Sequence, residues 1–305
     1  MDNELDRIEK ELVEENVAQI RTDFAAADAK RDANKKTPDD ILRFDNISYG
    51  NDSTWQILDV YKPKNAEKKL PVIVNVHGGA WVYGTKEVYQ FYCMNLAQHG
   101  FAVVNFTYRL APEHKFPASL EDTNAVFKWI LQNQEEYGFD CNNIFAVGDS
   151  AGANLLGLYS AICTNPDFRK RFDFDLPENL KINAVALNCG KFVMNLDEMI
   201  DVRFMAMMKA LINKESKFSI SDIDLPSKIT FDFPPTLLMT CRGDSLNEEI
   251  IPMMKAFYEY SVPYQVNVYG TKNAPLWHVF HCDPDMPQAK LCNNQQCDFF
   301  RNYMR

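Results

Sequence analysis

Residues 144–157 read IFAVGDSAGANLLG, and this stretch decides the fold. The four apolar residues that open it predict a buried strand, and residues 151–163 predict a helix directly after it. Ser150 stands on the sharp turn between them, and such a turn requires small residues at positions 148 and 152, where the chain has Gly148 and Gly152. Serine also caps ordinary helices, but the strand before it and the helix after it favour a nucleophile.

A second glycine motif follows an earlier predicted strand. His77 is followed by Gly78 and Gly79, which lack a Cβ and let the backbone approach a ligand closely. Both motifs come after buried strands, so we expect them at the same edge of the sheet. We predict that the N–H groups of Gly78 and Gly79, with that of Ala151 at the helix start, form an oxyanion hole.

An activated serine needs a base, and the chain has five histidines. His77 and His114 belong to loop motifs, and His99 lies at a predicted helix end before a glycine. The other two, His278 and His281, both follow the last predicted strand, where a serine on such a turn finds its base. The residue pattern alone leaves these two open.

We predict the acid of a catalytic triad at Asp244, which follows an apolar strand ending near residue 240. It lies between serine and histidine in chain order, and a carboxylate there would hold the imidazole in its working tautomer. The alternative is a cap on the helix that begins near Asn247. Asp283 and Asp285 come after His278 and break the chain order.

Strand-like and helical segments alternate along most of the chain, which predicts an α/β fold: a mostly parallel sheet with helices on both faces. The opening strands are joined by short turns and predict an antiparallel edge. The predicted strands lie near residues 41–49, 55–61, 71–77, 101–107, 143–147, 182–188, 236–240 and 264–269. The later predicted helices lie near residues 87–99, 120–134, 151–163, 248–260 and 286–303.

The chain contains no internal repeat and no low-complexity linker, so we predict a single domain over residues 1–305. Residues 1–40 are rich in charge and carry spaced apolar side chains, which predicts one or two amphipathic helices. Residues 190–233 form a connection rich in Met and Phe that is too long for a plain loop. We expect these two segments to form a cap over the sheet edge.

The composition excludes several functions. A net charge of -10 argues against a nucleic-acid surface, which needs clustered Lys and Arg. No stretch reaches the roughly 18 apolar residues of a membrane span, and the first residues lack the apolar core of a secretory signal. The eight cysteines form no C-x-x-C pair, so we expect reduced thiols in a cytoplasm. The sequence shows no nucleotide motif or metal-ligand cluster, and serine chemistry needs no cofactor or metal.

Several motifs together resemble the signature of the hormone-sensitive-lipase family of esterases, which has the α/β-hydrolase fold. They are His77-Gly78-Gly79, then Tyr108-Arg109-Leu110-Ala111-Pro112-Glu113-His114 with Phe116-Pro117-Ala118 and Asp122, then Gly148-Asp149-Ser150-Ala151-Gly152. The likeness is dense from Val72 to Gly157 and thinner towards the C-terminus. The middle motif is the most specific, and we expect Arg109 and Asp122 to form an ion pair that fixes the loop beneath the site.

The resemblance also bears on the base and the acid. Residues 277–280 read Trp-His-Val-Phe, which is similar to the family's His-Gly-Phe and implies His278 as the base, with His281 as runner-up. Asp244 and Leu246 match the family's Asp-x-Leu pattern. Three glycines that are usual in the family are replaced. Their positions hold Ala80, Ala153 and Val279.

The resemblance implies a serine carboxylesterase that hydrolyses short to medium acyl esters of small molecules through an acyl-enzyme, as a monomer or homodimer. One alternative is an arylformamidase or amidase with the same triad, because the Gly-x-Trp after His77 also resembles arylformamidases. Another is a ligand-binding module without catalysis, since plant gibberellin receptors resemble this family and have lost the base. Retention of Ser150, Asp244 and His278 weighs against that alternative.

Overall fold

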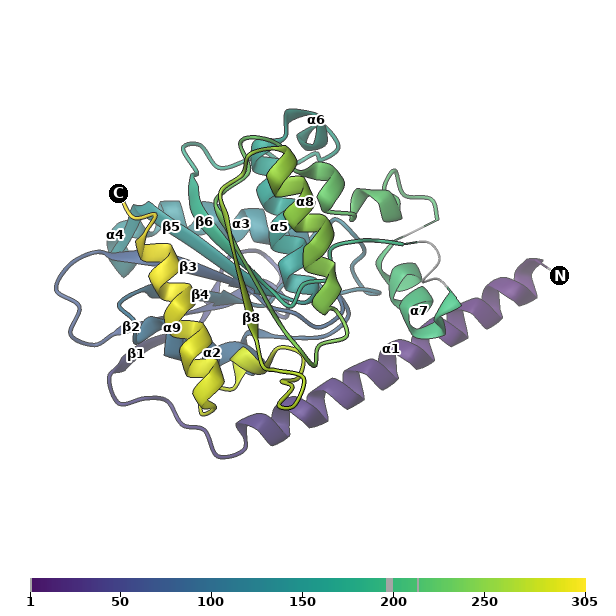
Figure 1. The fold of residues 1–305 in the computed structure, drawn as a ribbon. Helices are drawn as coiled ribbons and strands as arrows, with labels where there is room; N and C mark the ends of the chain where they lie inside the picture. The colour runs from purple at the N-terminus through teal and green to yellow at the C-terminus, as the bar shows by residue number, and fades with distance from the viewer. Residues whose placement is uncertain (1, 196–199, 213) are drawn as a thin grey trace.

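The computed structural model describes residues 2–195, 200–212 and 214–305. Within them, eight strands form one sheet in the order β1-β2-β4-β3-β5-β6-β7-β8 (Figure 1). The strands are β1 (Ile41–Ser48), β2 (Ile57–Pro63), β3 (Leu70–Val76), β4 (Ala102–Phe106), β5 (Phe139–Asp149), β6 (Ile182–Asn188), β7 (Thr236–Cys241) and β8 (Tyr264–Tyr269). β2 runs antiparallel to both β1 and β4, and the pairs from β4 to β8 are parallel. The prediction of a mostly parallel sheet with an antiparallel edge is confirmed.

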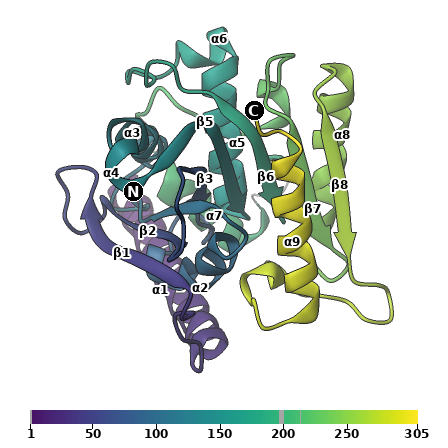
Figure 2. The ribbon, with the colours of Figure 1, turned by 90° about the vertical axis from the view of Figure 1, so that its left-hand side faces the viewer.

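Helices cover both faces of this sheet, as predicted (Figure 2). The α-helices are α1 (Asp2–Asp32), α2 (Lys86–Ala97), α3 (Ala118–Gln132), α4 (Gln134–Tyr137), α5 (Ala151–Thr164), α6 (Pro166–Arg169), α7 (Val202–Leu211), α8 (Ile250–Glu259) and α9 (Pro287–Arg301). Short 3₁₀ turns lie at η2 (Ile220–Asp222), η3 (Pro226–Lys228), η4 (Asn247–Glu249) and η5 (Phe280–Cys282).

The side chains of β3 show how one strand serves two cores. Val72 and Val74 pack into the cluster formed with α3, α5 and α8, whereas Ile73 packs into the cluster formed with α2 and α9. Successive residues of a strand point to opposite faces, so a run of consecutive apolar residues is what a doubly covered strand requires. Helix α5 is buried around almost its whole circumference, which explains why it is apolar on every side.

The N-terminal segment forms one long helix, α1, which runs along one side of the molecule with α7 packed against it (Figure 1). Ion pairs join the two helices, with Arg203 Nη2 2.7 Å from Asp23 Oδ2 and Lys209 Nζ 2.8 Å from Glu9 Oε2. Of the predicted cap segment 190–233, residues 196–199 and 213 lie outside the described residues. Among the described helices, none has both the length and the apolar character needed to cross a membrane.

The strand predicted near residues 143–147 is longer in the structure. β5 begins at Phe139, which pairs with Leu70 of β3, and it continues to Asp149, which pairs with Asn188 of β6. Its first half contains polar residues at 140, 142 and 143, so this part of the strand does not form an apolar run in the sequence. A register shift beside Val72 accommodates this polar stretch in the ladder.

The expected ion pair beneath the site is confirmed. Arg109 Nη2 lies 2.9 Å from Oδ1 of Asp122, whose side chain is fully buried. The same carboxylate accepts hydrogen bonds from the Arg109 backbone N–H at 2.8 Å and from Gln56 Nε2 at 2.7 Å. A buried charge is stable only with such partners, so this network fixes the loop after β4.

Candidate active site

Ser150 occupies a strained turn between β5 and α5. Its φ of +52° lies in the left-handed region that non-glycine residues rarely adopt. Its backbone N–H donates to the carbonyl of Asn188 at 2.9 Å, which anchors the turn to β6. A Cβ at Gly148 would lie 2.5 Å from the carbonyl oxygen of Gly152, and one at Gly152 would lie 2.1 Å from that of Val76. Both neighbouring positions therefore require glycine, as the motif predicts.

The structure brings His278 and Asp244 together. Nδ1 of His278 lies 2.9 Å from Oδ2 of Asp244, and the Asp244 side chain is fully buried. The other carboxylate oxygen accepts a hydrogen bond from the Leu246 N–H at 2.8 Å, so Asp244 also supports its own turn after β7. Burial acts to raise the pKa of Asp244, but the hydrogen bond and charge of His278 bring that pKa below its ordinary value. The carboxylate is therefore charged and directed at the imidazole.

The runner-up histidine lies in a different environment. His281 is completely buried, with its ring edge-to-face against Tyr92 at a centroid distance of 5.1 Å. Burial lowers the pKa of its imidazole to about 3. Its Nε2 lies 3.6 Å from Sγ of Cys282, and its Nδ1 has no hydrogen-bond partner among the described residues. It does not line the cavity that contains Ser150.

Ser150 and His278 line one cavity of about 180 Å³. The other lining residues come from α1, the glycine loop and the residues after it, α2, the end of β5 and the loop after β8. They are Phe24, Ala27, Asp28, Arg31, Gly78, Gly79, Ala80, Tyr83, Tyr89, Asp149 and Val279. The hydroxyl of Ser150 and the imidazole of His278 make no hydrogen bond to each other in this structure, so their contact stays a prediction. Such bonds are often long in unliganded enzymes and tighten when substrate binds.

The backbone N–H of Gly78 does not serve the cavity. It donates to Oδ1 of Asp149 at 3.1 Å and to the hydroxyl of Tyr89 at 3.0 Å. A donor held by two buried acceptors is not available to a substrate oxygen. The prediction that Gly78 belongs to the oxyanion hole is therefore wrong, because Asp149 and Tyr89 occupy its N–H.

The N–H groups of Gly79 and Ala80 in the glycine loop have no acceptor among the described residues, and the same holds for that of Ala151 at the first position of α5. Gly79 has a φ of +118° and Ala80 a φ of +54°, so the loop turns sharply at both residues. Ala80 was missed at the sequence level, although it stands where the related family often has a third glycine.

Asp149 and Tyr89 were also missed, and together they form the base of the glycine loop. The Tyr89 hydroxyl donates to Oδ2 of Asp149 at 2.8 Å. Burial raises the pKa of the Asp149 carboxyl to about 6. The sequence signal for Asp149 is its position directly before Ser150. A carboxyl group between a buried strand and a turn needs hydrogen-bond partners from a neighbouring segment.

Helix α1 supplies one wall of the cavity. Phe24 packs edge-to-face on Tyr83 at a centroid distance of 5.7 Å, and the Tyr83 hydroxyl donates to Oδ2 of Asp28 at 2.8 Å. Arg31 Nη1 lies 2.7 Å from Oδ1 of Asp28 and pairs with Asp32 as well. Lys35 Nζ lies 3.6 Å from Oδ1 of Asp32, so two cations offset the two carboxylates. The wall therefore combines a paired charge cluster with the apolar side chains of Phe24 and Ala27.

A larger hollow of about 720 Å³ lies between α1, the segment around Glu113, and Lys209 and Lys214. Its charged side chains are largely paired with one another, for example Arg21 Nη2 with Glu113 Oε2 at 2.7 Å. It contains none of the predicted site residues. We therefore assign the candidate active site to the smaller cavity, which both Ser150 and His278 line.

The strand order of this sheet, with a serine on the turn after β5 and a histidine in the loop after β8, defines the protein as an α/β-hydrolase. Comparison with protein families makes the class specific. The BD-FAE family model matches residues 58–246, which is more than half of the chain. The chain belongs to the BD-FAE family.

Curated relatives support an ester hydrolase. The chain is 28% identical over 252 residues to versiconal hemiacetal acetate esterase from Dothistroma septosporum, with 76% of this chain and 73% of that protein covered. It is 38% identical over 125 residues to carboxylesterase NlhH from Mycobacterium tuberculosis, which covers 39% of each chain. It is 36% identical over 138 residues to arylacetamide deacetylase from Bos taurus, covering 39% of this chain and 35% of that one. The latter two matches thus span about two-fifths or less of the relative.

Solved structures share the fold over nearly the whole chain. Esterase B from Lactobacillus rhamnosis superposes with a TM-score of 0.88 at 24% identity, covering 96% of both chains. A bacterial heroin esterase superposes with a TM-score of 0.74 at 22% identity, covering 93% of this chain and 91% of that one. The predicted α/β-hydrolase fold and the resemblance to hormone-sensitive-lipase-like esterases are confirmed.

Proposed function

We propose that this protein is a serine carboxylesterase in which Ser150 is the nucleophile, His278 the base and Asp244 the acid that orients the base. The observation that carries this proposal is the 2.9 Å contact between His278 and Asp244, with His278 and Ser150 lining the same cavity. Asp244 fixes the tautomer with the proton on Nδ1, which leaves Nε2 to accept the proton of Ser150.

In the first half of the reaction, His278 removes the Ser150 proton as the oxygen attacks the ester carbonyl. The carbonyl oxygen becomes an oxyanion, which the N–H groups of Gly79, Ala80 and Ala151 stabilise by hydrogen bonds. The imidazolium then protonates the departing alcohol, leaving an acyl group on Ser150. In the second half, His278 activates a water molecule, which releases the acid and restores the serine.

The size of the cavity supports the short end of the predicted acyl range. A volume of about 180 Å³ is smaller than the roughly 300–1,000 Å³ of pockets that enclose drug-sized ligands. Acetyl to butyryl esters of small alcohols therefore suit this site better than long acyl chains. Helix α1, which lines the cavity through Phe24 and Ala27, would limit the chain length, and a contribution of the segment 190–233 to the cap stays a prediction.

The amidase alternative keeps one supporting observation, the similarity to a protein named arylacetamide deacetylase. An amide differs from an ester mainly in its poorer leaving group, which the same histidine must protonate. Parallel assays of p-nitrophenyl acetate and p-nitroacetanilide separate the two, and we expect the ester to be strongly preferred.

Cytoplasmic location and a monomeric or homodimeric state stay predictions.

Replacement of the nucleophile tests the proposal. Ser150→Ala should lower kcat for p-nitrophenyl butyrate by on the order of 10⁴- to 10⁶-fold. Ser160→Ala is the matched control, because Ser160 lies on the same helix and donates only to the Leu156 carbonyl. A fluorophosphonate probe should label the wild type and the control but not Ser150→Ala. Unchanged hydrolysis in Ser150→Ala would refute the proposal, and an unlabelled wild type would favour a ligand-binding module.

A further inference from the structure

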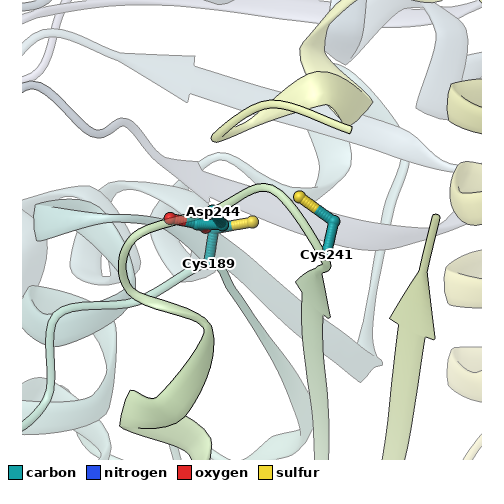
Figure 3. Close-up of side chains that lie close together, drawn as sticks. All are labelled: Cys189, Cys241 and Asp244. Atoms are coloured by element: carbon teal, nitrogen blue, oxygen red, sulfur yellow. The ribbon is translucent and has the colours of Figure 1, made fainter. Parts of the chain in front are cut away.

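Two thiols lie beside the proposed catalytic acid, and the reaction described above uses neither. Sγ of Cys189, Sγ of Cys241 and a carboxylate oxygen of Asp244 all lie within 4.8 Å of one another (Figure 3). All three residues are buried. Cys189 is more than fifty residues from the other two in the sequence, so the cluster forms only in the folded chain, and no local motif predicts it.

The backbone fixes both thiols at the carboxyl ends of adjacent parallel strands. Cys189 directly follows β6, and its N–H donates to the carbonyl of Met239 on β7 at 2.6 Å. Its φ of +46° bends the chain away from the strand direction. Cys241 ends β7, and its Sγ lies 3.3 Å from the carbonyl oxygens of both Leu276 and Trp277. The second thiol therefore contacts the segment directly before His278.

Two thiols and one carboxylate are a donor set for a thiophilic divalent cation. Zn²⁺ and Cd²⁺ bind thiolates strongly, whereas Mg²⁺ and Ca²⁺ require six or more oxygen ligands. Zn–S bonds of about 2.3 Å at tetrahedral angles place two sulfur atoms about 3.8 Å apart. A sulfur and a carboxylate oxygen bound in the same way lie about 3.6 Å apart. The observed separations of the three atoms are at most 4.8 Å, so each pair must approach by roughly 1.2 Å or less to occupy three of the four ligand positions.

We propose that Cys189, Cys241 and Asp244 form a binding site for Zn²⁺ or Cd²⁺, and that a cation bound there inhibits the enzyme. Binding converts both thiols to thiolates and releases two protons to solvent. The cation keeps its charge of +2, and the two thiolates and the carboxylate give the site a net charge of -1. Cys241 exchanges its contacts with the carbonyls of residues 276 and 277 for the bond to the metal.

The inhibitory effect rests on the proposed function, because it acts through Asp244. Oδ2 of Asp244 holds Nδ1 of His278, and a cation that coordinates this carboxylate competes with the imidazole for it. Neither Cys189 nor Cys241 lines the cavity. The cation should therefore lower kcat with little change in KM, since it disturbs the base and not the binding of substrate.

Cadmium titration measures binding without any reference to activity. In the presence of a phosphine reductant, Cd²⁺ should produce the ultraviolet charge-transfer absorption of cadmium thiolate with one ion per chain. Ser150→Ala should show the same absorption, because it keeps the three ligands. Cys189→Ser and Cys241→Ser should each lose it. Cys141→Ser is the matched control, because Cys141 is a partly exposed thiol on β5, and it should keep the absorption.

Inhibition is then measured on the same samples, each compared with its own rate without metal. Saturating Cd²⁺ should lower kcat of the wild type by on the order of 10²-fold or more, as expected when the acid no longer orients the base. EDTA should restore activity. Cys189→Ser and Cys241→Ser should need at least about tenfold more Cd²⁺ for half inhibition. Cys189→Ala and Cys241→Ala serve as second variants if a serine variant fails to fold.

The two proposals fail in different ways. Absence of the absorption in the wild type, or its persistence in both cysteine variants, would overturn the metal site. Absorption in the wild type without loss of kcat would overturn the link to Asp244. Continued hydrolysis by Ser150→Ala would instead overturn the proposed function, while the absorption would still establish the metal site.

Discussion

Nδ1 of His278 lies 2.9 Å from Oδ2 of Asp244, although the two residues come from loops that follow different strands. The Asp244 side chain is fully buried, whereas that of His278 is 37% exposed. The imidazole is therefore held from its protected side and presents its other edge to the cavity. A general base in acyl transfer requires this arrangement, in which one nitrogen is held by the acid and the other faces the substrate.

Asp244→Asn tests the role of the acid. Asparagine keeps the shape of the side chain but favours the wrong tautomer of His278, so we expect kcat for p-nitrophenyl butyrate to fall by on the order of 10⁴-fold. Asp283→Asn is the control, since Asp283 pairs with Lys35 outside the cavity. If Asp244→Asn kept more than about a tenth of the wild-type kcat, Asp244 would not be the triad acid.

Replacement of His278 and replacement of His281 should have different effects on kcat. His278→Ala removes the proposed base and should abolish measurable esterase activity. His281→Leu, of similar volume, replaces a buried neutral ring whose pKa burial already lowers to about 3, and kcat should stay within a few-fold of the wild type. Steady-state kinetics, with circular dichroism to verify folding, decides between them. Loss of activity in a folded His281→Leu, with activity kept in His278→Ala, would reverse the assignment.

Two alanines at positions where the related family often has glycine should differ in the sign of their effect on stability. Ala80 has a φ of +54°, so Ala80→Gly should raise the free energy of unfolding by about 1 kcal/mol. Ala153 is buried in α5, so Ala153→Gly should lower it by about 1 to 2 kcal/mol. Urea unfolding measures both changes. Equal signs would contradict the backbone assignment at one of the two positions.

Asp149 should make stability depend on pH. Burial raises its pKa to about 6 in the folded protein, against about 3.8 as the ordinary value. Between these values the folded state binds more protons than the unfolded state, so the free energy of unfolding falls as pH rises from about 4 to about 6. This difference in pKa corresponds to a decrease in the free energy of unfolding on the order of 3 kcal/mol.

Asp149→Asn removes this titration. Urea unfolding at each pH gives the free energy of unfolding of the variant and of the wild type. The variant's value minus the wild-type value should increase by on the order of 3 kcal/mol between pH 4 and pH 7. Asn accepts from the Gly78 N–H as the carboxylate does, so the loop contact is preserved. A difference that did not vary with pH would show that Asp149 keeps an ordinary pKa.

Local patterns predicted most of the fold. The strands Ile182–Asn188 and Tyr264–Tyr269 have the predicted bounds, because each is a compact segment between clear breaks. The start of β5 was missed, since residues 140–143 are mainly polar and their strand conformation depends on pairing with β3. Pairing partners of this kind are far away in sequence and leave no local periodicity.

The candidate site also has a part that local motifs predict and a part that they do not. The turn at Ser150 has a local motif, and the structure places it as the motif predicts. The assignment of Gly78 failed because its N–H donates to Asp149, at the end of β5, and to Tyr89, on α2. A glycine pair predicts a close approach of the backbone but not which N–H stays available. That choice depends on side chains that only the folded chain brings near.

Helix α1 borders the cavity through Phe24, and the loop after β8 borders it through Val279. Residues 24 and 279, which lie far apart in the sequence, thus complete one enclosure. A nascent chain on the ribosome has the turn at Ser150 long before the loop that carries His278 emerges. The proposed triad is therefore completed late in synthesis, after all the strands described above have been made.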